Sequence, residues 1–245
     1  MKFFSADYIF PISDNPIKNG VIQLTEDGEV VKVAVREDFP TVDIKSLKGI
    51  LLPGFVNAHC HLELSHMKNL CETRLGLIEF ISKVVSLRDF EEDIIQRHIA
   101  ERDQEMYENG IQAVGDICNK LDTAEVKRKS KIHYYSFVEM FDLLQKEMTA
   151  SAIENYRSVF RDQADNGLNK KSFVPHAPYS VSPELFHFIN KANPEEKVVS
   201  IHNQETLDEL RLFSENKGGF YGFYKKLGLD ISDFKSQQKS SMSYI

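Results

Sequence analysis

From residue 51 onward, short apolar runs alternate with stretches of helical periodicity, and this alternation is the feature that most constrains the fold. Runs rich in β-branched residues are typical of buried strands, whereas apolar residues every three or four positions indicate helices. Strands that alternate with helices form βα units around a parallel sheet. The first expected strand begins at Leu51 and leads to His59. The other four cover residues 111–118, 132–140, 173–176 and 198–202. The expected helices cover 75–87, 90–108 and 147–164, with two more that begin at Ser182 and Glu205.

This pattern predicts an α/β fold of the TIM-barrel type, (β/α)8, of which about five βα units are present. The residues after position 50 are too few for a complete barrel, which usually needs about 250. We therefore expect an incomplete barrel over residues 51–245, either as the amino-terminal part of a longer protein or as a truncated product.

The first 50 residues have a different pattern, with β-rich runs at residues 2–11, 20–24 and 29–35. Asp27-Gly28 lies between the last two runs, and glycine readily takes the positive φ that a tight hairpin turn needs. Residues 1–50 are therefore predicted to form a small all-β segment that precedes the barrel.

Four of the eight histidines follow apolar runs, at the carboxyl ends of expected strands: His59, His61, His176 and His202. Side chains two positions apart in a strand point to the same face, so His59 and His61 can share one metal ion. Alone, such a pair is equally typical of two half-buried structural histidines. The later strand-end histidines favour a metal site, because strand ends of a parallel barrel meet at one mouth, where active sites lie. Zinc is the first choice for imidazole ligands.

Composition excludes several classes of partner. A net charge of −7 and a pI near 5.7 argue against nucleic acid or an anionic membrane as the main partner, since both require a basic surface. No run approaches the roughly 18 apolar residues of a membrane span, and Asp7 interrupts the apolar start too early for a signal peptide. Three cysteines without a Cys-x-x-Cys pair indicate no disulfide framework. We expect a cytoplasmic protein that binds a small molecule.

Three motifs resemble successive motifs of the amidohydrolase superfamily. They are Pro-Gly-Phe-Val-Asn-Ala-His-Cys-His-Leu-Glu at residues 53–63, His-Ala-Pro-Tyr-Ser at 176–180 and His-Asn-Gln-Glu-Thr at 202–206. The branch that they resemble most contains cytosine, guanine, adenosine-type and aminofutalosine deaminases and related chlorohydrolases. The resemblance covers the amino-terminal part of such proteins and implies that residues 1–50 are a segment of a β-sandwich.

The resemblance also implies one divalent metal ion, with zinc the first choice and iron the alternative, and hydrolysis by a water that this ion activates. Seven residues match positions with roles in the family: His59, His61 and His202 as metal ligands, Glu205 as the catalytic proton shuttle, and Glu63, His66 and His176 as substrate contacts. A proton shuttle that works near neutral pH is expected to have a raised pKa.

The implied function is that of a hydrolase acting on non-peptide carbon–nitrogen bonds, by deamination of an amino-substituted heterocycle or a nucleoside-like molecule. A homodimer is expected. Two alternatives remain open: the same site could hydrolyse another C–N or a C–Cl bond, or the chain could be an inactive fragment. The second arises because the resembled branch takes a histidine from the sixth strand and an aspartate from the eighth, and no matching residue follows Glu205.

Overall fold

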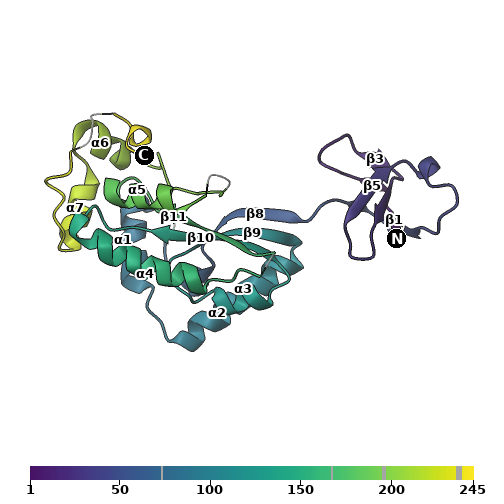
Figure 1. Cartoon of the computed structure of the whole chain (residues 1–245), viewed down its shortest axis with the longest axis horizontal. Coiled ribbons are helices and arrows are strands. Elements are labelled where there is room, and N and C mark those ends of the chain that lie inside the picture. The colour runs from purple at the N-terminus through teal and green to yellow at the C-terminus, as the bar shows by residue number, and fades with distance from the viewer. Residues whose placement is uncertain (73, 167, 195–196, 236–238) are drawn as a thin grey trace. The chain divides into compact units, whose positions relative to one another are not determined.

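The computed structural model describes residues 1–72, 74–166, 168–194, 197–235 and 239–245, and Figure 1 shows its course. The chain divides into two compact units, Met1–Phe55 and Val56–Ile245. Among the described residues, no helix is long and apolar enough to cross a membrane.

The amino-terminal unit contains two small sheets, with strand orders β5-β4-β1-β6 and β3-β2-β7. The Asp27-Gly28 turn joins β4 to β5, which pair in the antiparallel direction, and Gly28 has φ of 93°. The predicted hairpin is therefore confirmed, whereas the predicted run 2–11 is divided into two strands. The elements are β1 (Lys2–Ser5), β2 (Tyr8–Ile9), β3 (Ile17–Lys18), β4 (Val21–Leu24), β5 (Val30–Ala34), the 3-10 turn η1 (Arg36–Asp38), β6 (Lys45–Ser46) and β7 (Ile50–Leu51).

The larger unit is built on one four-stranded sheet in the order β11-β10-β9-β8. β10 pairs in the parallel direction with both β9 and β11, and helices follow the strands along the chain, as the sequence predicted. The strands are β8 (Phe55–Cys60), β9 (Ile111–Cys118), β10 (His133–Met140) and β11 (Lys170–Pro175). The helices are α1 (Leu77–Leu87), α2 (Glu92–Glu108), α3 (Ala124–Lys129), α4 (Thr149–Asp162), α5 (Pro183–Ala192), α6 (Leu207–Glu215) and α7 (Gly219–Lys226). Short 3-10 turns are η2 (Leu62–Met67), η3 (Lys146–Met148) and η4 (Ser241–Ser243).

The start of α5 shows how local sequence sets these elements. The Ser182 hydroxyl accepts a hydrogen bond from the Leu185 N–H at 3.2 Å, and Pro183 occupies the first helical position, where its missing N–H costs nothing. The helix then buries Leu185 and Ile189 in a core with side chains of β9, β10 and β11. This capped and packed helix fixes the loop that follows β11, which carries His176.

Residues 198–202 differ from the prediction, because they form no strand. The segment is tied to the sheet by single contacts: the Ser172 hydroxyl donates to the Val198 carbonyl at 2.7 Å, and the His202 N–H donates to the His176 carbonyl at 2.9 Å. Val198 and Val199 are more than half exposed, since few side chains cover this part of the described chain. The predicted fifth strand is thus wrong as a strand, although its end still places His202 beside His176.

The apolar run before His59 also differs from expectation, because it is not buried. Phe55 and Val56 are 56% and 69% exposed. β8 lies at an edge of the described sheet, with β9 on one side only. β8 therefore brings His59 and His61 to the end of the sheet although its first two side chains are exposed.

Helix α7 was not predicted. Phe220, Phe223 and Tyr224 recur at helical spacing and are buried against Leu212 and Phe213 of α6. Because this region is rich in glycine and lysine, the sequence did not indicate its short amphipathic helix, whose apolar side is aromatic.

Candidate metal centre

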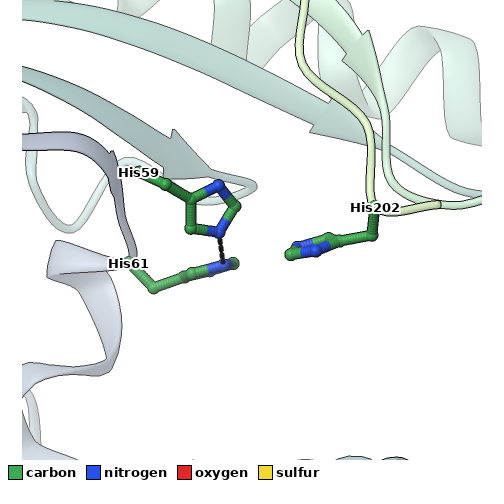
Figure 2. Close-up of side chains that lie close together, drawn as sticks. All are labelled: His59, His61 and His202. Atoms are coloured by element: carbon green, nitrogen blue, oxygen red, sulfur yellow. Dashed lines mark hydrogen bonds between the residues drawn. The ribbon is translucent and has the colours of Figure 1, made fainter. Parts of the chain in front are cut away.

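His59 and His61 are brought together at the carboxyl end of β8. The strand ends at Cys60, and His61 stands at the start of η2, so the two imidazoles lie on the same side, as the alternation of a strand predicts. Their Nε2 atoms are 3.2 Å apart. Figure 2 shows both rings turned toward one another and toward His202.

His202 approaches the same point from the loop before α6. Its ring centroid lies 4.9 Å from that of His59 and 5.8 Å from that of His61. One ligand atom from each of the three side chains falls within 4.8 Å of the other two. His59, His61 and the sequence-remote His202 therefore present imidazole nitrogens to one volume.

The donor set fits a divalent ion. Nitrogens bound to one tetrahedral zinc at about 2.0–2.1 Å lie about 3.3 Å apart, close to the spacing of the His59 and His61 Nε2 atoms. Burial, followed by the neighbouring His202, lowers the pKa of His59. Burial and then His59 lower the pKa of His61 to about 4. Both rings are therefore neutral near pH 7, which is the form that binds a metal.

Glu205 lies against His202, at Nδ1 of the ring. Its Oε1 is 3.0 Å from His202 Nδ1, and its Oε2 accepts a hydrogen bond from the Tyr179 hydroxyl at 3.2 Å. The hydrogen bond to His202 outweighs desolvation and lowers the pKa of Glu205. The expected raised pKa is therefore wrong for this structure, because two donors stabilise the ionised carboxylate.

Glu209 also holds the main chain of Glu205. Its side chain is buried in the first turn of α6. The Glu209 carboxylate accepts hydrogen bonds from the N–H groups of Gln204 and Glu205, both at 2.9 Å. Gln204 has φ of 60°, a left-handed conformation that costs energy in a residue other than glycine. The buried carboxylate stabilises this turn between His202 and Glu205.

His176 stands beside the histidine cluster. Its Nδ1 is 2.6 Å from the Ser180 hydroxyl, and its ring centroid lies 5.5 Å from that of His202. Burial lowers the pKa of His176 to about 3. The ring is therefore neutral, and His176 forms a second group of close ligand atoms with His202 and Glu139.

Glu139 is a site residue that the sequence reasoning missed. It is buried near the end of β10, with Oε1 4.0 Å from His202 Nε2. Burial raises its pKa to about 8. Glu139 is the second-to-last residue of β10, an apolar strand. A search for carboxylates at strand ends, like the one made for histidines, would have found it. Tyr179 was also missed, although it lies inside a quoted motif.

Glu63 and His66 lie in a network around Arg88. Glu63 is buried, and its Oε2 accepts hydrogen bonds from the N–H groups of Asn119 at 3.0 Å and Lys120 at 3.3 Å. Arg88 Nη2 donates to Oε1 of Glu63 at 3.3 Å, and His66 Nε2 is 2.9 Å from the Arg88 carbonyl. Burial raises the pKa of Glu63 to about 7. These contacts hold η2 against the end of β9, and a substrate contact by either residue stays a prediction.

The sequence model of the amidohydrolase family matches residues 50–229, which include the cluster and most of the larger unit. The chain belongs to the amidohydrolase family. Members with similar sequences include an adenosine deaminase of Helicobacter pylori, 28% identical over 198 residues. That alignment covers 80% of this chain and 48% of the relative, so the amidohydrolase chain spans about half the length of the curated relatives it matches.

Solved structures of the family show the same fold. Helicobacter pylori aminofutalosine deaminase in complex with methylthio-coformycin superposes with a TM-score of 0.76 at 20% identity, covering 98% of this chain and 59% of that one. An adenosine deaminase from Xanthomonas campestris with bound zinc gives 0.67 at 19% identity, covering 93% and 55%. With the parallel sheet, these similarities confirm an α/β fold that is an incomplete amidohydrolase barrel.

Proposed function

We propose that this amidohydrolase is a metal-dependent hydrolase that removes an amino group from an adenine-nucleoside-like molecule. The observation that carries the proposal is the convergence of His59, His61 and His202 on one volume, with Glu205 against His202. The family membership and the adenosine and methylthioadenosine deaminases among the sequence relatives support the reaction and the substrate class.

His59, His61 and His202 would hold the ion, which we propose to be zinc, with iron as the alternative. A divalent ion held by neutral imidazoles supplies Lewis acidity, which makes hydrolysis by water possible near neutral pH. The protein's own part is to align the three rings and to keep those of His59 and His61 neutral, whereas the hydrogen bond to Glu205 raises the pKa of His202. The lowered pKa values of His59 and His61 and the short distance between their Nε2 atoms fit this task.

Glu205 is the proposed proton shuttle. Its carboxylate takes a proton from the attacking water and transfers it to the departing nitrogen, which leaves as ammonia. Tyr179 and His202 hold its two oxygens in fixed directions. Ligand atoms of His176 and Glu139 lie close to His202, and we propose that these two side chains bind the substrate.

We also propose how the chain is divided into domains. Residues 1–50 would form a β-sandwich segment and residues 51–245 the partial hydrolase barrel. A homodimer and a cytoplasmic location stay predictions from the sequence.

The test has two stages. The zinc-loaded chain, after dialysis, is expected to retain close to one equivalent of metal. It is then assayed for ammonia release from adenosine, 5′-deoxyadenosine, 5′-methylthioadenosine and guanine, with an amino-chloro-triazine as a C–Cl substrate. Glu205→Gln should abolish release and keep the zinc, whereas Glu154→Gln on the exposed side of α4 should change neither. A zinc-loaded chain that releases no ammonia from any of these substrates would reject deamination by this chain.

A further inference from the structure

A buried ion pair lies beside the turn from β8 into η2, which carries His61. Asp116 of β9 and Lys127 of α3 both have fully buried side chains, and Lys127 Nζ is 2.6 Å from Asp116 Oδ2. Lys127 also donates to the Ser136 hydroxyl at 2.9 Å. Burying two charges is costly, and such a pair commonly contributes little to stability compared with apolar side chains of the same size. A role in holding neighbouring groups would account for its presence here.

The Asp116 carboxylate contacts the residues on both sides of His61. Its Oδ1 accepts a hydrogen bond from the Leu62 N–H at 2.8 Å. It also lies beside the Cys60 thiol, whose pKa is raised to about 12 by burial and then by this carboxylate. Cys60 points away from the metal side of the strand, so Asp116 holds the backbone of His61 from behind.

Gly115 allows β9 to come this close. A Cβ atom on Gly115 would lie only 2.6 Å from the Ala58 carbonyl oxygen of β8. The glycine and the aspartate that follows it therefore bring the two strands together at the point where the histidines emerge. Lys127 of α3 in turn holds Oδ2, the second oxygen of the Asp116 carboxylate.

We propose that Asp116, oriented by Lys127, is the positioning residue for the His59–His61 pair. Without the Leu62 N–H bond, the turn from β8 into η2 loses the only side-chain acceptor that the described residues give it, and His61 Nε2 can drift away from His59 Nε2. Asp116 itself touches neither the ion nor the substrate. This inference rests on the proposed metal role of His59, His61 and His202.

The experiment measures zinc affinity of the metal-stripped full chain by competition with a chromogenic chelator. Asp116→Leu/Lys127→Met removes both charges and the acceptor, whereas Asp116→Asn/Lys127→Met removes the charges and keeps an oxygen for Leu62. The control is Tyr134→Phe, which loses a part-buried hydrogen bond to Asp103 in the same core and removes no acceptor of the Leu62 N–H. Circular dichroism and thermal melting check that each variant is folded.

We expect zinc affinity to fall about 10- to 100-fold in the leucine double variant, as is typical when a group that supports a metal ligand is removed. The asparagine double variant and Tyr134→Phe should stay within about threefold of wild type, on the same scale. A folded leucine double variant that binds zinc as tightly as wild type would overturn the inference.

A second variant and a direct check complete the design. Should the leucine double variant not fold, Asp116→Glu keeps the charge and displaces the oxygens by one methylene, and it is expected to weaken zinc binding. Wild-type affinity in a folded Asp116→Glu would overturn the inference. His61→Asn must itself lose zinc. A wild-type chain that holds no zinc, or a His61→Asn chain that binds it normally, refutes the metal assignment instead, and this inference with it.

Discussion

Glu209 gives the sharpest stability test of how the site is held. In wild type, both oxygens of the Glu209 carboxylate accept a main-chain N–H. In Glu209→Gln, one oxygen remains as an acceptor and an NH₂ group replaces the other. One of the N–H groups of Gln204 and Glu205 is left without its partner. The turn between His202 and Glu205 should loosen, because the left-handed Gln204 depends on this carboxylate.

The size of the effect follows from two contributions. A hydrogen bond to a charged group contributes about 1.5–3 kcal/mol, and loss of a negative charge in the first turn of a helix costs about 0.3–1 kcal/mol. Asp208→Asn provides a matched control, because Asp208 carries the same charge in the same turn but accepts its hydrogen bond from Gly219 instead. The difference between the two variants isolates the donor, and we expect it to be about 2 kcal/mol.

The assay is urea unfolding of the two variants and the wild type, followed by turnover in the ammonia assay. A displacement of Glu205 by about 1 Å should lower kcat about 100-fold in Glu209→Gln, whereas Asp208→Asn should retain it. Equal unfolding free energies in the two variants would refute the claim that Glu209 supports this turn. Normal turnover in a destabilised Glu209→Gln would show that the position of Glu205 does not depend on it.

Three further predictions follow from the same contacts. Tyr179→Phe removes the hydroxyl that donates to Glu205, so kcat should fall with little change in KM, whereas Tyr224→Phe, which loses a bond to the Tyr179 carbonyl, should not alter kcat. Gly115→Ala should lower both the melting temperature and zinc affinity, because its Cβ would collide with the Ala58 carbonyl; an unchanged melt would contradict this. Zinc at 100 times its Kd should raise the unfolding free energy of wild type by about 2.7 kcal/mol, and His59→Asn should remove that gain.

Much of the fold could be predicted, because strand and helix periodicities are local properties of the sequence. β9, β10 and the helices α1, α2 and α5 lie close to their predicted ranges. The segment 198–202 could not be predicted correctly, because its β-branched residues favour a strand, yet a strand exists only where a neighbour supplies hydrogen bonds. The described residues give it single contacts to Ser172, Tyr135 and His176 instead.

The candidate site divides in the same way. The placement of His59 and His61 on one side follows from the period of a strand. The meeting with His202 was predicted from parallel strand ends, although the segment that carries His202 forms no strand. The supporting carboxylate Asp116 could not be assigned from sequence, because its partner is the main-chain N–H of Leu62, a residue remote in the chain. Glu209 accepts from main-chain N–H groups only four and five residues away, so its role is local. The lowered pKa of Glu205 likewise depends on a hydrogen-bond geometry that only coordinates reveal.

The central claim is that three imidazoles hold one divalent ion, and X-ray absorption at the zinc edge of the loaded chain tests it most directly. The account predicts a first shell of nitrogen and oxygen at about 2.0–2.1 Å, with outer-shell scattering from three imidazoles in wild type and from two in His202→Ala. A zinc shell that contains sulfur, or a spectrum that His202→Ala leaves unchanged, would contradict it.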